Sequence, residues 1–182
     1  MNQRIIYLNG FMAAGKSTIG PILANTLGWD FYDLDKVIEK ELGEKIVDIF
    51  RTRGEKYFRD KESETLIRLS RLCNVVISLG GGTSSNNNNL EIISRTGKVV
   101  YLKASPEALF NRLKNKKDRP LFNTGDVEKS KEELKNRIIQ LLRQRTPYYE
   151  QADLIIDTDN YPLGLTVDKI ARLISKKIDE EN

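Results

Sequence analysis

Residues 10–17, Gly-Phe-Met-Ala-Ala-Gly-Lys-Ser, are the stretch from which the fold of this chain can be argued. They match the pattern G-x-x-x-x-G-K-[ST] at every fixed position, directly after an apolar run and before a segment with helical spacing. A strand, such a loop and a helix in this order form a cradle in which backbone N–H groups and the helix N-terminus face phosphate groups. The motif therefore predicts an α/β protein that binds ATP through a P-loop.

Each polar position of the loop has a predicted role in holding the nucleotide. Lys16 should reach the β- and γ-phosphate oxygens, and the Ser17 hydroxyl should ligate Mg²⁺. The other nucleotide contacts that we expect from this stretch are Gly10, Ala13, Ala14, Gly15 and Thr18. ATP and Mg²⁺ are thus the ligands predicted for this half of the site.

Apolar runs rich in Ile, Val and Tyr alternate with segments of helical spacing along the whole chain. The predicted strands are residues 5–8, 75–79, 99–102 and 154–156, with residues 31–34 as a weaker fifth candidate. The predicted helices are residues 17–27, 36–41, 46–50, 55–72, 106–115, 128–145 and 167–178. This alternation predicts one domain over residues 1–182, a three-layer sandwich with a five-stranded parallel sheet flanked by helices.

Composition narrows the chemistry that this domain can perform. The chain has 182 residues, of which 31% are charged, and it contains one cysteine and no histidine. Histidine-based catalytic triads and histidine-ligated metals are therefore excluded, and proton transfer falls to carboxylates. The net charge of +4 suits anionic small molecules and would also suit nucleic acid. Because no apolar run approaches roughly 18 residues and no signal-type stretch is present, we expect a cytoplasmic protein.

Two polar segments do not fit the strand and helix pattern. Residues 83–89, Thr-Ser-Ser-Asn-Asn-Asn-Asn, are predicted to form a loop that leads into a helix at Leu90. Residues 112–131 are crowded with charges and hold few apolar anchors, so we expect an exposed and mobile segment. Such a segment over a ligand site can act as a lid, here placed at about residues 112–128.

Two aspartates follow the predicted strand at residues 31–34. Residues two apart on a strand share a face, so Asp33 and Asp35 can enter one site at the carboxyl end of the sheet. One carboxylate could hold a water of Mg²⁺, and the other could accept a hydrogen bond or a proton from an acceptor hydroxyl. The alternative is that the pair only caps the helix that begins at Lys36.

Several further motifs, taken in chain order, resemble the shikimate kinase family over most of the sequence. After the loop and Thr-Ile-Gly at 18–20 come Asp-Leu-Asp at 33–35, Ile-Phe at 49–50, Gly-Glu-Lys-Tyr-Phe-Arg at 54–59 and Glu62. Ser-Leu-Gly-Gly-Gly at 78–82, Arg-Pro-Leu at 119–121, Arg-Thr-Pro-Tyr-Tyr at 145–149 and Asp-Thr at 157–158 follow. The resemblance implies ATP-dependent phosphorylation of the 3-hydroxyl of shikimate, a step of aromatic amino-acid biosynthesis.

The resemblance also implies a role for particular residues. Arg59 and Arg145 would clamp the shikimate carboxylate, with Glu62 orienting Arg59. Phe50 and Phe58 would pack on the ring, and Gly80, Gly81 and Gly82 would let the ligand approach the backbone. The catalytic set would be Lys16, Asp35 and Arg119, with Asp33 beside Mg²⁺, Arg119 on the lid, and Arg112 and Pro162 flanking adenine. The acceptor-binding region would span about residues 36–65.

Other interpretations stay open at this point. A gluconate-type or nucleoside-monophosphate kinase would share the P-loop, the lid and the sheet, although Arg59, the glycine run and Arg145 argue against both. A nucleotide-dependent nucleic-acid-binding module would use the positive charge instead, but the lysines are scattered among acids. We expect a monomer with no nucleic-acid or membrane partner. Ala14 and the asparagines at 86–89 depart from the family pattern without removing a catalytic group.

Overall fold

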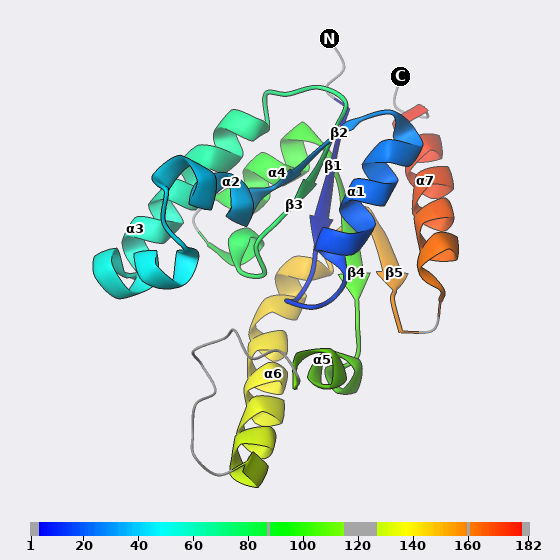
Figure 1. Ribbon diagram of the computed structural model, residues 1–182. Coiled ribbons are helices and arrows are strands. Elements are labelled where there is room, and N and C mark those ends of the chain that lie inside the picture. The colour runs from blue at the N-terminus through cyan, green and yellow to red at the C-terminus, as the bar shows by residue number, and fades with distance from the viewer. Residues whose placement is uncertain (1–3, 87, 115–126, 160, 180–182) are drawn as a thin grey trace.

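A parallel sheet forms the centre of the molecule in the computed structural model, which describes residues 4–86, 88–114, 127–159 and 161–179. Within these residues, five strands run in the order β2-β3-β1-β4-β5, and all neighbouring pairs are parallel (Figure 1). The strands are β1 (Ile5–Asn9), β2 (Asp30–Asp33), β3 (Val75–Ser78), β4 (Lys98–Lys103) and β5 (Leu154–Asp157). The order reverses beside β1, and ligands of open parallel sheets bind at such a point.

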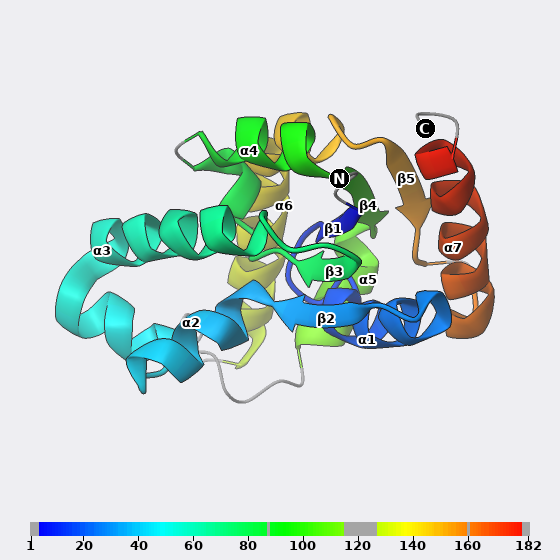
Figure 2. The same cartoon turned by 90° about the horizontal axis from the view of Figure 1, so that it is seen from above.

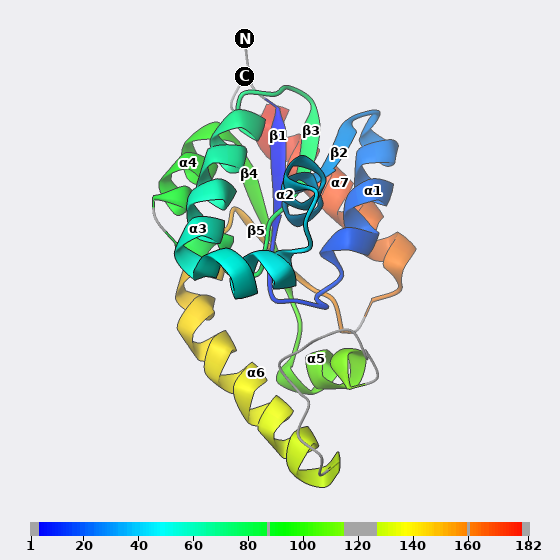
Figure 3. The same ribbon diagram turned by 60° about the vertical axis from the view of Figure 1, so that its left-hand side comes forward.

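Helices cover both faces of this sheet and extend past one end of it. They are α1 (Lys16–Leu27), α2 (Leu34–Leu42), α3 (Ile46–Leu69), α4 (Asn89–Thr96), α5 (Pro106–Leu113), α6 (Val127–Tyr149) and α7 (Leu163–Asp179). Figure 2 shows α1 and α7 on one face and α3 and α4 on the other. Figure 3 shows α5 and α6 projecting beyond the carboxyl ends of the strands. The predicted three-layer α/β sandwich is confirmed.

The three central strands β1, β3 and β4 are buried along most of their length, which explains their apolar sequences. Alternate residues of β1 point to opposite layers: Ile6 and Leu8 pack with the α1 and α7 side, whereas Ile5 and Tyr7 pack with the α2, α3 and α4 side. All four side chains are at most 1% exposed. Two cores therefore fix β1, and with it the loop that follows β1.

Several element boundaries differ from the prediction for identifiable reasons. The predicted helices 46–50 and 55–72 are the two arms of α3, which is kinked at Gly54 (φ 81°, ψ 168°). Residues 83–89 are not only loop, because Thr83–Ser85 form a 3₁₀ turn and α4 begins at Asn89. Part of the segment 112–131 is helical, since Arg112 lies in α5 and α6 begins at Val127. The remainder of the predicted lid, residues 115–126, lies outside the described residues.

Candidate active site

The loop after β1 has the backbone conformation that a phosphate cradle needs. Gly10 (φ 139°), Ala13 (φ 63°) and Gly15 (φ 108°) all have positive φ, so the chain turns back on itself before α1. A Cβ on Gly10 would lie 2.7 Å from the carbonyl oxygen of Leu102, so β4 leaves no room for a side chain. Ala14 is 1% exposed, and its small side chain fits this packed turn. The departure at position 14 is therefore compatible with the loop.

The polar side chains of the loop already make ordered contacts. Lys16 Nζ donates to the carbonyl oxygens of Gly10 at 2.7 Å and Phe11 at 3.0 Å. Ser17 Oγ donates to Asp33 Oδ2 at 3.0 Å. The amine of Lys16 is thus held across the mouth of the loop, and the hydroxyl of Ser17 lies against a carboxylate from β2.

The two aspartates reach the site by a route that differs from the prediction. Asp33 ends β2, and its Oδ1 caps α2 by accepting from the backbone N–H of Lys36 at 3.3 Å. Asp35 lies in the first turn of α2 and not on the strand, so strand alternation is the wrong reason for their proximity. Capping and site formation occur together, because Asp33 Oδ2 still faces Ser17.

Asp35 has the electrostatic surroundings of a general base. Burial is the largest cause that raises its pKa, to about 6, and the neighbouring carboxylates of Asp33 and Glu62 raise it further. Lys16 and Arg59 act in the opposite direction. A carboxyl group with a pKa near 6 is ionised at neutral pH and is still basic enough to accept a proton from a hydroxyl.

Arg59 is the centre of a cluster of charged and aromatic side chains from both arms of α3. Its Nη1 donates to Glu62 Oε2 at 2.8 Å, and its Nη2 lies 3.2 Å from Glu55 Oε1. The guanidinium carbon lies 5.1 Å from the ring centroid of Phe58 and 5.9 Å from that of Phe50. The predicted arginine and both predicted aromatic residues are therefore brought together.

The glycine run after β3 is where the acceptor side chains converge. A Cβ on Gly80 would lie 2.9 Å from Asp35 Oδ1, and one on Gly82 would lie 3.0 Å from Arg59 Nη2. The sequence predicts that the missing side chains admit a ligand to the backbone. That role stays a prediction, and the distances add a second one: without Cβ atoms, the glycines allow the acceptor side chains to close on one another.

The carboxyl end of α6 brings Arg145 to the same place. A Cβ on Gly81 would lie 3.3 Å from Arg145 Nη1, and the Arg145 guanidinium carbon lies 5.7 Å from the Phe11 ring centroid. The hydroxyl of Tyr149 donates to the carbonyl oxygen of Gly81, and burial raises the pKa of Tyr149 to about 12. Tyr149, for which no individual role was predicted, therefore anchors the end of α6 to the glycine run.

Arg112 connects the P-loop to the turn after β5. Its Nη1 donates to the carbonyl oxygen of Ala13 at 3.3 Å, and its Nη2 donates to the carbonyl oxygen of Thr158 at 2.9 Å. Asp159 lies 3.6 Å away and completes the ion pair. Thr158 has no role predicted from the sequence, since only its place in a family motif drew attention to it.

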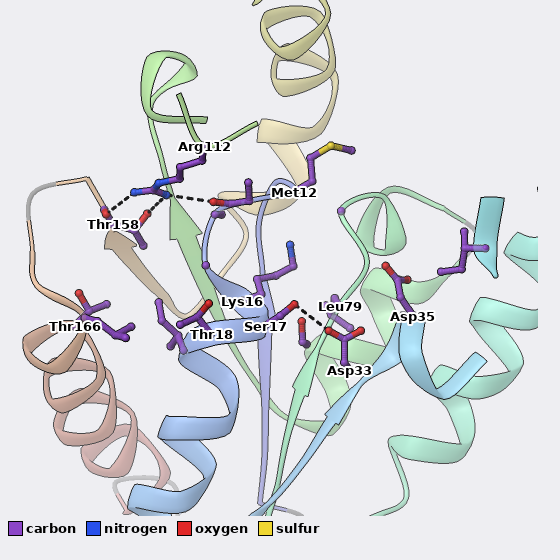
Figure 4. Close-up of a pocket in the computed structure, with 18 of the residues that line it drawn as sticks. Met12, Lys16, Ser17, Thr18, Asp33, Asp35, Leu79, Arg112, Thr158 and Thr166 are labelled. Carbon is purple, nitrogen blue, oxygen red and sulfur yellow. Dashed lines mark hydrogen bonds between the residues drawn. The ribbon is translucent and has the colours of Figure 1, made fainter. Parts of the chain in front are cut away.

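One pocket of about 1370 Å³ joins these parts at the carboxyl ends of the strands. Figure 4 shows Lys16 between Arg112 and Thr158 on one side and Asp33 and Asp35 on the other. Single-ligand pockets usually measure about 300–1,000 Å³, so this one has room for a nucleotide beside a small acceptor.

The pocket separates the predicted residues into three groups. Those that line it are Ala13, Ala14, Gly15, Lys16, Ser17, Thr18, Asp33, Asp35, Phe50, Gly81 and Arg112. Those that lie behind this lining or beside it are Gly10, Phe58, Arg59, Gly80, Gly82, Arg145 and Pro162. Pro162 is exposed, and its neighbours Tyr161 and Leu163 line the pocket instead. Arg119 lies outside the described residues.

A P-loop at the reversal point of a parallel sheet, facing a half-buried aspartate and with two arginines behind the pocket lining, defines an ATP-dependent small-molecule kinase. Comparison with known proteins narrows this class. The family model for shikimate kinase matches residues 12–178. The chain therefore belongs to the shikimate kinase family.

Curated relatives and solved structures agree with that assignment. A shikimate kinase from Chlorobaculum parvum is 47% identical over 178 residues, which cover 97% of this chain and 95% of the relative. The crystal structure of shikimate kinase from Bacteroides thetaiotaomicron is 36% identical, with a TM-score of 0.86, over 94% of this chain and 98% of that one. Shikimate kinase from Acinetobacter baumannii in complex with shikimate is 34% identical, with a TM-score of 0.84, over 96% and 94%.

The length and apolar character of the helices show whether any of them could cross a membrane. Within residues 4–86, 88–114, 127–159 and 161–179, no helix is both long enough and apolar enough to cross a membrane.

Proposed function

We propose that the protein transfers the γ-phosphate of ATP to the 3-hydroxyl of shikimate, giving shikimate 3-phosphate and ADP. One observation carries this choice of acceptor: Asp35, Arg59 and Arg145 all close on the glycine run at 80–82, beside the P-loop. Shikimate has a carboxylate at one end and hydroxyls at the other, so it needs cations and a hydrogen-bond acceptor in this arrangement. The relative from Acinetobacter baumannii that carries shikimate supports the same acceptor.

The side chains divide the work of the reaction between them. Arg59 and Arg145 hold the carboxylate, because a guanidinium fork matches two carboxylate oxygens. Asp35 then accepts the hydrogen bond of the attacking hydroxyl and takes its proton as the bond to phosphorus forms. Lys16 leaves the carbonyl oxygens of the loop and neutralises the charge that develops on the phosphate oxygens.

Ser17 and Asp33 are the residues that would hold Mg²⁺. Their side-chain oxygens lie 3.0 Å apart at the mouth of the P-loop, and both are the hard oxygen ligands that this ion prefers. When bound with the nucleotide, Mg²⁺ would offset negative charge on the phosphates. Asp33 is kept in position as the N-cap of α2, and Ser17 lies in the first turn of α1.

The role of Arg119 at the tip of a lid over residues 112–128 stays a prediction. Four other expectations also stay predictions: a monomer, a cytoplasmic location, no nucleic-acid partner, and one domain over residues 1–182.

The acceptor can be tested directly with purified protein. ADP release is measured with shikimate, gluconate, AMP and CMP as separate acceptors, and the phosphorylated product is assigned by ³¹P NMR. We expect turnover with shikimate to exceed turnover with the others by at least roughly 10³-fold, because a site built to bind a polar group rejects analogues that lack it. Comparable turnover with gluconate or a nucleoside monophosphate would overturn the proposal.

A further inference from the structure

Residues 83–89, the polar run that follows the glycines, have no role in the function described so far. The first of them, Thr83, nevertheless contacts Glu62 on the acceptor side of the site. Thr83 begins the 3₁₀ turn and is 0% exposed. Its Oγ1 donates to Glu62 Oε1 at 2.6 Å. Glu62 Oε2 in turn accepts from Arg59 Nη1 at 2.8 Å. The hydroxyl of Thr83 is therefore one side chain away from the arginine that binds the shikimate carboxylate.

The backbone of Thr83 is fixed from both sides. Its N–H donates to the carbonyl oxygen of Gly80 at 3.1 Å, and its own carbonyl oxygen accepts from Asn89 Nδ2 at 3.0 Å. Asn89 is 0% exposed, so this contact is shielded from water. The side chain of Asn86 makes a similar bond to the carbonyl oxygen of Gly82. The asparagine run thus supplies two amides that hold the turn carrying Thr83.

Three oxygens meet at the start of this turn. A Cβ on Gly80 would lie 2.9 Å from each of Asp35 Oδ1, Glu62 Oε1 and Thr83 Oγ1. Two of these oxygens belong to carboxylates, and the third belongs to a neutral hydroxyl that donates its proton to Glu62. Glu62 is 0% exposed, and a buried carboxylate needs a partner for each oxygen. Thr83 and Arg59 provide one partner each, which holds Glu62 in a single orientation.

We propose that Thr83 is a positioning residue for the acceptor: its hydroxyl fixes Glu62, and Glu62 aims the guanidinium of Arg59 at the carboxylate of shikimate. The proposal deepens the function proposed above and depends on it for the identity of the acceptor. Thr83 touches neither the nucleotide loop nor the reacting oxygen in this account. Its removal should therefore weaken acceptor binding and leave ATP binding unchanged.

Isosteric substitution isolates the hydroxyl. Thr83→Val keeps the shape of the side chain and removes the donor, whereas Thr83→Ser keeps the donor and removes a methyl group. We expect Thr83→Val to raise the Kd for shikimate roughly tenfold, in line with the loss of one hydrogen bond to a charged group. Thr83→Ser should restore most of that affinity, and the Kd for ATP should change by less than about twofold in both. Isothermal titration gives both constants, and thermal melting verifies folding.

A double-mutant cycle with Arg59→Lys separates positioning from a merely structural role. If Thr83 acts through Arg59, then Thr83→Val should weaken shikimate binding by less than about threefold in the Arg59→Lys background, where the fork is already lost. An independent tenfold loss in that background would overturn the proposal. So would a Thr83→Val variant that melts earlier but binds shikimate normally.

Two further measures keep the test decisive. Thr83→Ala removes the same donor without adding volume, so it replaces the valine variant if the latter does not fold. The unmodified enzyme is titrated first. If it bound a different acceptor and not shikimate, the proposed function would fail, while the same cycle with that acceptor would still decide whether Thr83 acts through Arg59.

Discussion

The two halves of this active site are built by different means. The nucleotide half is made mainly by the backbone of one loop, where Gly10, Ala13 and Gly15 take positive φ and β1 and α1 hold the two ends. The acceptor half is made by side chains that come from α2, α3 and α6 and close on three glycines. The first half is local in sequence, and the second exists only when distant elements have packed together.

This difference decides how each half responds to change. A backbone cradle depends on few side chains, so substitution of its one lysine should remove chemistry and leave the fold. An interlocked set of side chains transmits a change in one member to the others, because Asp35, Glu62 and Arg59 all lie near the same glycines.

The largest effect should come from the lysine of the nucleotide half. Lys16→Ala is expected to lower kcat by roughly 10²–10³-fold, the range for loss of one preorganised charge at a developing anion. A coupled assay of ADP release measures it, with the exposed Lys36→Ala as the matched control. A folded Lys16→Ala variant with unchanged turnover would remove the P-loop from the mechanism.

The acceptor half should be sensitive to a single added methyl group. Gly80→Ala would place a carbon 2.9 Å from three oxygens, including Asp35 Oδ1, so the acceptor residues must separate. We expect the KM for shikimate to rise by roughly 10–100-fold, since displaced acceptor residues would lose a hydrogen bond to a charged group, worth about 1.5–3 kcal/mol. The KM for ATP should stay within about twofold, because no P-loop atom is among these contacts. Gly164→Ala, where a Cβ would meet nothing within 4 Å, is the control that should leave shikimate binding unchanged.

A smaller effect concerns the free energy of unfolding, which the ionised Asp35 carboxylate of the acceptor half lowers at neutral pH. The pKa of Asp35 is raised from its ordinary value near 3.8 to about 6, so the folded chain holds this proton more tightly than the unfolded chain. Its contribution to folding is therefore most favourable below pH 4 and is lost as the pH rises through 6. Asp35→Asn should raise the free energy of unfolding at pH 7.5 on the order of 1–2 kcal/mol, after allowance for partial exposure.

Urea unfolding at two pH values tests this sign. The advantage of Asp35→Asn should shrink as the pH falls to 4, where the folded parent carries the proton and the unfolded parent is about half protonated. The exposed Asp60→Asn serves as the matched control and should change the free energy of unfolding at pH 7.5 by less than about 0.5 kcal/mol. A variant that is less stable than the parent at pH 7.5 would mean that the ionised Asp35 stabilises the fold.

The contrast between the halves also explains what the sequence could predict. The P-loop was predictable to the residue, because its spacing and its place after a strand are both local. The central strands were predictable as well, since burial on both faces leaves continuous apolar runs such as residues 5–8, whereas the exposed edge strand β2 was only a weaker candidate. Asp33 and Asp35 were predicted to share the site for the wrong reason, because α2 begins one residue after Asp33.

Other contacts of the acceptor half could not be predicted from the sequence, because they form between residues that are distant along the chain. Arg59 and Arg145 are 86 positions apart in the sequence, and only family resemblance connected them. Thr83 and Asn89 make their contacts through a turn whose geometry depends on the packing of α3 and α4 against it. Tyr149 was part of a motif, but its bond to Gly81 forms only because α6 continues past Arg145 and Pro147.

The division of the site into two halves is tested most directly by replacing arginine with lysine in each half and measuring the affinity for both ligands. Arg59→Lys and Arg145→Lys should each lose about 1–3 kcal/mol of shikimate binding, because the charge stays and the planar fork is lost. Arg112→Lys should weaken ATP instead, and Arg53→Lys, on the same helix as Arg59 but paired with Glu44, should change neither. Titration of the four variants with both ligands gives the answer. If ATP affinity falls in Arg59→Lys while shikimate affinity holds, the assignment of the two halves is contradicted.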